Sequence, residues 1–203
     1  MGYVLYDYLP SGNGYKCRLT MKALGIPYEL VQMDIVAGAT RTPGFLAINP
    51  NGKVPVLVVP GRGPLAESHA IINFLAEGSK LMPQDAYGRG LVWQWLCFEQ
   101  YQLEPGAATV RFWLKSLKKT PEEFGEKYVE RFQRGADALA VLERGLTGRT
   151  WLVGDDVTLA DIALFAYTHV ADEAGYRMSD YPAIEAWIAE FKRLPWYSPI
   201  TAP

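Results

Sequence analysis

The chain has few residues of the kinds that bind metals or exchange disulfides, with two cysteines and two histidines among 203 residues. Cys17 and Cys97 form neither a Cys-x-x-Cys pair nor a metal-ligand spacing, which argues against a dithiol centre and a zinc site. Each lies in a predicted helix beside apolar neighbours, so we expect two buried free thiols. His69 and His169 have no acidic or metal-ligating partner at a suitable spacing, so we expect structural or surface roles for both. No metal is predicted.

Charge of one sign and long apolar runs are also scarce. The formal net charge is −2, and the lysines and arginines are scattered, so we expect no phosphate-binding face and no nucleic-acid partner. No apolar run approaches the roughly 20 residues that span a bilayer. The first residues include Asp7 and no basic cluster, unlike a signal peptide. We therefore expect a cytoplasmic protein with no membrane partner.

The first third of the chain alternates between strand and helix patterns. Short runs rich in β-branched and aromatic residues predict strands at 4–8, 28–33, 56–59 and 64–66. Helical patterns lie between and after these strands, at 14–24, near Thr42, and at 68–77. Strands joined by a helical crossover should be parallel, and the last two should form an antiparallel hairpin. This βαβαββα order is typical of a thioredoxin-like domain.

The rest of the chain has helical periodicity throughout, which predicts an all-helical second domain. We expect a thioredoxin-like domain at 1–80, a linker at 81–87 and a helical bundle at 88–203, so the fold class is α/β plus all-α. One helix start is well marked, because Thr158 and Asp161 have the spacing of a capping box. We assign this pair to folding and not to chemistry.

A proline directly before the third predicted strand is the first indication of a binding site. Pro55 donates no backbone hydrogen bond, and the strand follows it at once. If the Val54–Pro55 bond is cis, the N–H and C=O of Val54 point outward without a partner in the sheet. An extended peptide would then pair with Val54, in a one-residue version of strand addition. The alternative is that Pro55 only begins a strand.

An acid–serine pair opens the next predicted helix. Ser68 is expected to be the N-cap of the apolar-periodic run that follows, with Glu67 just before it. The amides and dipole of a helix N-terminus attract carboxylates, and Glu67 would suit an ammonium group. A ligand with an amino acid head matches both charges. Ordinary capping by Ser68 and solvation of Glu67 remain the alternative.

These motifs resemble those of a known family. The run NPNGKVPVL at 49–57, followed by ESHAII at 67–72, is similar to the glutathione-binding signature of the cytosolic glutathione transferases. The run GDDVTLADIA at 154–163 is similar to the C-terminal signature of the same family. The motifs occur in the family's order along nearly the whole chain, which most resembles serine-type, bacterial members.

The resemblance implies a detoxifying transferase with the glutathione transferase fold, which uses glutathione as co-substrate and no metal. Val54, beside Pro55, would supply the backbone pairing, and Glu67 and Ser68 would hold the γ-glutamyl end. The glycine carboxylate would pair with a cation, for which there are two candidates, Lys53 and Arg41.

The chemistry is expected where the first strand leads into a helix. The glutathione thiol, like a free cysteine, has a pKa of about 8.5, and the thiolate is the nucleophile. Lowering this pKa by about two units needs roughly 2.7 kcal/mol, and a hydroxyl hydrogen bond to a charged acceptor contributes about 1.5–3 kcal/mol. In serine-type members the activating serine occupies the position of Ser11, so we carry that role to Ser11. Asn13 and Tyr8 are the alternative donors.

The site of the second substrate is harder to predict. The stretch 93–113 is rich in aromatic residues, and Tyr101 and Trp113 are candidates to face an apolar cleft that takes a small hydrophobic electrophile. The same aromatics would also suit a core or a dimer interface. The family resemblance implies a homodimer.

Two alternatives to conjugation remain. Redox-active members carry a cysteine where this chain has Gly12-Asn13-Gly14, so disulfide exchange through an enzyme thiol is disfavoured. Reduction of disulfides or peroxides by bound glutathione alone stays open. A non-catalytic scaffold for protein contacts is the other alternative, although a scaffold has no need to keep the glutathione motifs together.

Overall fold

The computed structural model describes residues 2–203, which divide into two compact units. The first unit runs to Ser79 and also includes the C-terminal segment Trp196–Pro203, while the second is Lys80–Pro195. The sequence pattern assigned the whole stretch 88–203 to the helical domain. The packing of the C-terminal segment with the first unit was therefore not predicted.

Four strands form one mixed sheet in the first unit. They are β1 (Tyr3–Asp7), β2 (Tyr28–Gln32), β3 (Val56–Val59) and β4 (Gly63–Ala66), in the order β2-β1-β3-β4. β1 is parallel to β2, and β3 is antiparallel to both β1 and β4. With the intervening helices the chain order is βαβαββα, so the predicted thioredoxin-like fold is confirmed.

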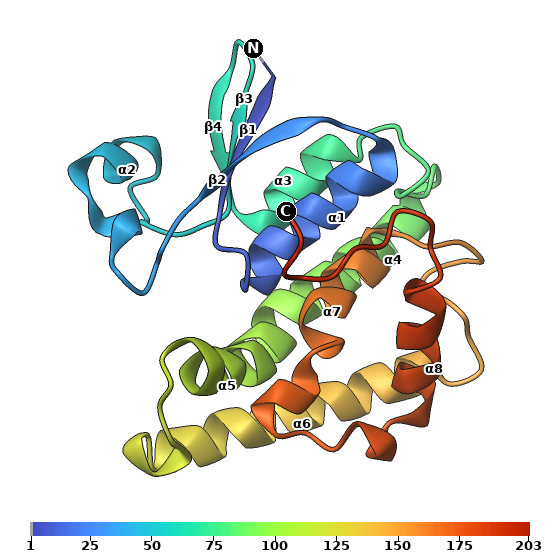
Figure 1. The fold of residues 1–203 in the computed structure, drawn as a ribbon. Helices are drawn as coiled ribbons and strands as arrows, with labels where there is room; N and C mark the ends of the chain where they lie inside the picture. The colour runs from blue at the N-terminus through green and yellow to red at the C-terminus, as the bar shows by residue number, and fades with distance from the viewer. Residues whose placement is uncertain (1) are drawn as a thin grey trace. The chain divides into compact units, whose positions relative to one another are not determined.

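Three helices cover this sheet. They are α1 (Gly12–Leu24), α2 (Pro43–Ile48), which follows the short 3₁₀ turn η1 (Ala39–Arg41), and α3 (Ser68–Leu75). α1 and α3 lie side by side on one side of the sheet, and α2 lies on the other (Figure 1). Strand alternation explains this arrangement. Asp7 is buried toward α1, whereas the ring of Tyr6 meets that of Phe45 in α2, with centroids 6.0 Å apart.

A buried ion pair joins β1 to α1. Arg18 Nε lies 3.4 Å from Asp7 Oδ2, and both side chains are almost fully buried. Gly14 permits this approach, because a Cβ at that position would lie 1.5 Å from Asp7 Oδ1. Burial raises the pKa of Asp7 to about 6, and the Arg18 charge and the Tyr8 amide, which donates to Oδ1, oppose this rise.

The same helix holds the C-terminal segment. Arg18 Nη2 donates to the carbonyls of Leu9 and Ile200, both at 2.9 Å. The Tyr15 hydroxyl donates to the carbonyl of Ser198. One guanidinium therefore connects the end of β1, the loop that follows it and the last residues of the chain.

The regular elements of the second unit are all helical in the part of the chain described. Its elements are α4 (Ala86–Phe98), η2 (Glu99–Ala108), α5 (Thr109–Arg111), η3 (Phe112–Ser116), η4 (Pro121–Glu123), α6 (Glu126–Leu146), α7 (Leu159–Thr168), η5 (Ala171–Ala174), η6 (Met178–Asp180) and α8 (Pro182–Phe191). η2 and η3 are π-helical, and η2 contains Pro105, which has no N–H to donate. Glycines let η2 and α6 pack closely, because a Cβ at Gly106 would lie 2.5 Å from the nitrogen of Gly135.

Every residue of α7 is buried, and its first turn contains the predicted capping box. Thr158 N donates to Asp161 Oδ2 at 2.9 Å, and Ala160 N donates to Thr158 Oγ1 at 3.3 Å. Asp161 Oδ1 accepts from Leu152 N at 3.0 Å and from Trp187 Nε1 at 3.1 Å. Burial raises the pKa of Asp161 to about 6, and these hydrogen bonds oppose the rise. The folding role assigned to this pair therefore has a structural basis.

The two cysteines differ in exposure. Cys17 is buried in α1 as predicted, but Cys97 in α4 is exposed, so the prediction of a second buried thiol is wrong. An apolar residue one turn before Cys97 in the same helix, Trp93, is itself 42% exposed. Within residues 2–203, no group of three or more His, Cys, Asp and Glu side chains is placed to hold a metal ion. No helix in that range has the length and apolar character needed to cross a membrane.

Candidate functional site

The loop after β1 places Ser11 at the start of α1. Ser11 N donates to the Tyr8 carbonyl at 2.7 Å, which closes a turn, and the Ser11 carbonyl accepts from Tyr15 N at 3.0 Å. Ser11 is thus the N-cap of α1, yet within the described chain its hydroxyl makes no capping hydrogen bond. This hydroxyl can therefore bind a ligand at the positive end of the helix dipole. Tyr8, the alternative hydroxyl, is half-buried just beyond β1.

Asn13 of α1 and Ser68 of α3 are in contact. Ser68 Oγ donates to Asn13 Oδ1 at 3.4 Å, and Ser68 is 4% exposed. The N-cap of α3 is Glu67, so the prediction that Ser68 caps this helix is wrong. Ser68 is the first helical residue, and its hydroxyl reaches Asn13 in place of an amide of its own helix. The first turns of α1 and α3, which carry the predicted thiol and γ-glutamyl ends of the site, are therefore hydrogen-bonded.

Glu67 has an unusual backbone conformation. Its φ of 71° lies in a region that residues other than glycine rarely adopt. Its side chain is exposed, and Oε1 accepts from Asn51 Nδ2 at 3.4 Å. Backbone strain of this kind costs of order 1–3 kcal/mol and clusters at ligand-binding sites. A role for Glu67 in binding agrees with this strain and stays a prediction.

The segment before β3 presents backbone groups without partners. The Val54–Pro55 peptide bond is cis. Among residues 2–203, neither the N–H nor the C=O of Val54 pairs with another backbone group. The preceding residue is fixed, because Asn49 Nδ2 donates to the Lys53 carbonyl at 2.8 Å. An extended peptide can therefore reach both polar groups of Val54.

Both candidate cations for the glycine carboxylate, Arg41 and Lys53, are exposed. Arg41 Nη1 donates to the carbonyl of Asn51 at 3.3 Å and lies against Gly52, where a Cβ would be 2.4 Å from Nη1. Because the side-chain amide of Asn51 also contacts Glu67, one residue links the candidate for the carboxylate with the candidate for the ammonium group. The choice between Arg41 and Lys53 stays open.

The two residues predicted for the electrophile lie in the helical unit, and within the described chain their rings do not form an aromatic pair. Tyr101 is 71% exposed, with the guanidinium carbon of Arg134 5.4 Å from its ring centroid. Trp113 stacks on Phe124, with ring centroids 3.9 Å apart. Their assignment to a shared electrophile site stays a prediction.

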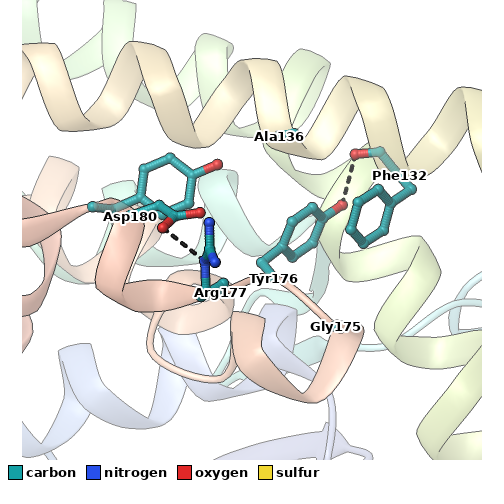
Figure 2. A pocket seen from close by; sticks show the side chains of 7 residues that line it. Phe132, Ala136, Gly175, Tyr176, Arg177 and Asp180 are labelled. Carbon is teal, nitrogen blue, oxygen red and sulfur yellow. Dashed lines mark hydrogen bonds and ion pairs between the residues drawn. The ribbon is translucent and has the colours of Figure 1, made fainter.

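A pocket of about 400 Å³ lies elsewhere in the helical unit (Figure 2). Its lining includes Phe132 and Ala136 of α6 and residues 175–177 and 180–181. The Tyr176 hydroxyl donates a hydrogen bond to the Phe132 carbonyl at 3.0 Å, and the two rings are stacked. None of the residues predicted for the site lines this pocket, so it gives no support to Tyr101 or Trp113.

Two models of protein-family domains match this chain. The model of the glutathione S-transferase N-terminal domain matches residues 1–77, and that of the glutathione S-transferase C-terminal domain matches residues 107–195. A crystal structure of a glutathione S-transferase from Pseudomonas fluorescens is 45% identical, with a TM-score of 0.95 over 100% of both chains. The chain belongs to the glutathione S-transferase family.

Two further similar proteins are named for a redox activity and for glutathione transfer. A disulfide-bond oxidoreductase of Escherichia coli, YfcG, is 28% identical, and the match covers 93% of this chain and 89% of that protein. A glutathione transferase from Burkholderia graminis has a crystal structure with two glutathione molecules bound per subunit. It is 30% identical, with a TM-score of 0.83 over 96% of this chain and 85% of that one.

Two charged residues next to the site were not predicted from the sequence. Lys16 and Arg18 of α1 are 0% and 1% exposed, although charged residues on a helix are usually solvated. One signal for this was present in the sequence. The two cations are about 200° apart around a helix of 3.6 residues per turn. When such a helix packs on a sheet and on another helix, the two side chains cannot both face the solvent.

Proposed function

We propose that this protein conjugates the thiolate of glutathione to a small hydrophobic electrophile. The observation that carries the proposal is the Ser11 hydroxyl, which lies at the N-terminus of α1 without a capping hydrogen bond in the described chain. It is next in the sequence to the helical turn in which Asn13 contacts Ser68. We assign the activity to the cytoplasm, where thiols are kept reduced.

Each end of glutathione has a proposed partner in the first unit. The γ-glutamyl carboxylate would bind at the N-terminus of α3, where Ser68 supplies a hydroxyl and helix amides favour an anion. The γ-glutamyl ammonium would pair with Glu67, and the peptide groups would pair with Val54. A cation, Lys53 or Arg41, would hold the glycine carboxylate, and the thiol would then lie near Ser11.

The proposed reaction needs only a stabilised thiolate. The thiol releases its proton to solvent, and the Ser11 hydroxyl donates a hydrogen bond to the sulfur. The sulfur then attacks an electrophilic carbon, so that a C–S bond forms and the leaving group departs with its electron pair. We propose that Tyr101 and Trp113 offer aromatic faces to the electrophile.

The Ser11→Ala variant tests this assignment. A hydrogen bond to a charged acceptor contributes about 1.5–3 kcal/mol, so we expect the turnover of a reactive aryl halide to fall roughly tenfold to a hundredfold at neutral pH. Isothermal titration should show that glutathione binding is largely retained. Ser179→Ala, at an exposed position of the helical unit, is the matched control. Unchanged turnover in Ser11→Ala would remove Ser11 from the role, and Asn13 and Tyr8 would be tested next.

A second candidate is the reduction of disulfides by glutathione, which is favoured by the similarity to the E. coli disulfide-bond oxidoreductase. Cys17 is poorly suited to serve as an enzyme thiol, because it is fully buried and burial raises its pKa. The reaction would therefore consume two glutathione molecules, the first forming a mixed disulfide and the second releasing oxidised glutathione and two thiols. Two molecules bound per subunit in the Burkholderia relative agree with such a stoichiometry. Parallel assays with an aryl halide and a small dialkyl disulfide would separate the two reactions.

We also propose that the protein is a homodimer. Tyr87 and Trp93 are large aromatic residues of α4 with exposures of 78% and 42%. Exposed aromatic residues of this size are enriched in protein interfaces. Light scattering during size-exclusion chromatography would measure the mass, and a monomer at micromolar concentration would contradict the proposal.

A further inference from the structure

One arginine of α6 contacts both the backbone and the side chain of Tyr101. Arg134 Nη2 donates to the Tyr101 carbonyl at 2.6 Å. The guanidinium carbon of Arg134 lies over the Tyr101 ring, 5.4 Å from its centroid. A guanidinium at this distance from the face of an aromatic ring is attracted to it electrostatically. The same side chain therefore holds Tyr101 at two points, its carbonyl and its ring.

The carbonyl contact has a reason in the sequence. In an α-helix the N–H of residue 105 would donate to the carbonyl of residue 101, but Pro105 has no N–H. Arg134 donates to this carbonyl from another helix. The next residue, Gly135, lets the two helices approach, because a Cβ there would lie 2.8 Å from the nitrogen of Ala107. η2 is π-helical, and π-helical turns are frequent at functional sites.

The Tyr101 ring is held without being covered. Tyr101 is 71% exposed, whereas Arg134 is half-buried. Arg134 Nε is buried and has no hydrogen-bond partner among residues 2–203, and loss of solvent around a guanidinium strengthens its attraction to a ring. A side chain that is already ordered loses less rotamer freedom when a ligand binds to it. The exposed part of the Tyr101 ring is therefore a preorganised aromatic surface.

We propose that Arg134 is a positioning residue for the second substrate, and this inference rests on the proposed function. Arg134 fixes the Tyr101 ring from one face, and the exposed part of the ring stacks on the electrophile. The face of a tyrosine ring carries negative charge density, which suits an aromatic ring with electron-withdrawing groups. The preferred substrates are therefore electron-poor aromatic electrophiles, such as nitro-substituted aryl halides.

Arg131 supplies a matched control, because it contacts the same π-helical segment in a different way. It lies one turn before Arg134 on α6, and its Nη1 donates to the Pro105 carbonyl at 3.2 Å. Within the described chain Arg131 forms no cation–π pair. Arg131→Met thus removes the same charge and one carbonyl contact from the same helix, but leaves the Tyr101 ring held.

The test is the steady-state kinetics of conjugation with a chlorodinitrobenzene at saturating glutathione. In Arg134→Met we expect kcat/KM to fall about threefold to tenfold, mainly through a higher KM, because the ring must be ordered as the substrate binds. Arg131→Met should leave KM unchanged. An alkyl iodide of similar size has no ring to stack, so its turnover should be equal in the wild type and in Arg134→Met. The ultraviolet absorbance of the bound glutathione thiolate should also be unchanged.

A double-mutant cycle with Tyr101→Leu separates positioning from a general effect of charge. If Arg134 acts through the ring, then Arg134→Met in the Tyr101→Leu background adds little further loss. Full additivity, an unchanged KM in Arg134→Met, or an equal loss in Arg131→Met would overturn the inference. If Arg134→Met does not fold, Arg134→Lys carries the same test, because it keeps the charge but lacks the planar group. Failure of the wild-type protein to conjugate glutathione to the aryl halide would contradict the proposed function itself, so the two failures are distinguishable.

Discussion

Replacing Arg18 with methionine should destabilise the first unit in a pH-dependent way. The change leaves Asp7, which is 0% exposed, without the guanidinium 3.4 Å from its carboxylate. Removing one partner of a buried ion pair costs about 3–5 kcal/mol, because the other charge is left uncompensated. The carbonyls of Leu9 and Ile200 also lose their donor, so we expect the free energy of unfolding at neutral pH to fall by about 3–5 kcal/mol.

The pH dependence follows from the pKa of Asp7. In the folded wild-type chain this pKa is about 6, above the ordinary value of 3.8. The folded state therefore binds more protons than the unfolded state between these values, and the contribution of Asp7 to stability decreases as the pH rises through this window. Arg18 opposes the rise in pKa. Without Arg18 the window extends above pH 6, and stability continues to fall there by up to about 1.4 kcal/mol per pH unit.

The assay is urea unfolding at several pH values between 5 and 8, combined with amide hydrogen exchange of β1 and α1, which reports on the first unit alone. Arg62→Met, which removes an exposed arginine of the same unit, is the control. The double variant Asp7→Asn, Arg18→Met should recover much of the loss, because no buried charge remains uncompensated. An equal loss at pH 5 and pH 8, or no recovery in the double variant, would refute this reasoning.

Two further predictions concern the helical unit and the thiols. Asp161→Asn should lower the free energy of unfolding by about 2–4 kcal/mol in chemical denaturation, because an amide group replaces one oxygen and at least one buried donor, such as Thr158 N, loses its acceptor. Glu130→Gln, which makes the same carboxylate-to-amide change at an exposed position of α6, is the surface control, and a loss below about 1 kcal/mol in Asp161→Asn would contradict the role of Asp161 in the capping box. In the native protein an alkylating reagent should modify Cys97 quickly and Cys17 only on unfolding, because Cys17 is fully buried and burial raises the pKa of its thiol. Mass spectrometry would detect the sites, and rapid labelling of Cys17 without loss of structure would contradict its burial.

The features that sequence predicts well here are those set by neighbours along the chain. Strand alternation places Tyr6 and Asp7 on opposite faces of the sheet, and the spacing of Thr158 and Asp161 contains the whole capping box. Both rest on backbone periodicity over a few residues. The order of strands and helices is local in the same sense, which is why the thioredoxin-like arrangement could be predicted.

The features that could not be predicted from the sequence depend on residues far apart in the chain. Ser68 is of a residue type common at N-caps, but Glu67 is the N-cap and Asn13 accepts a hydrogen bond from the Ser68 hydroxyl. Lys16 is buried because an asparagine of the preceding turn and a histidine of another helix surround its ammonium group. Nothing in the local pattern distinguishes such a lysine from a solvated one. The roles assigned to the site residues rest on the family resemblance and on this geometry, and stay predictions.

The C-terminal segment has a consequence for how the chain is made. The first unit is discontinuous, since it consists of the residues up to Ser79 and of Trp196–Pro203, with the whole helical unit inserted between them. During synthesis the N-terminal part emerges first and begins to fold. Arg18 and Tyr15 can donate to the carbonyls of Ile200 and Ser198 only after the whole helical unit has been synthesised. A polypeptide that stops short of Trp196 would lack these partners, so the first unit is complete only when residues 196–203 have been made.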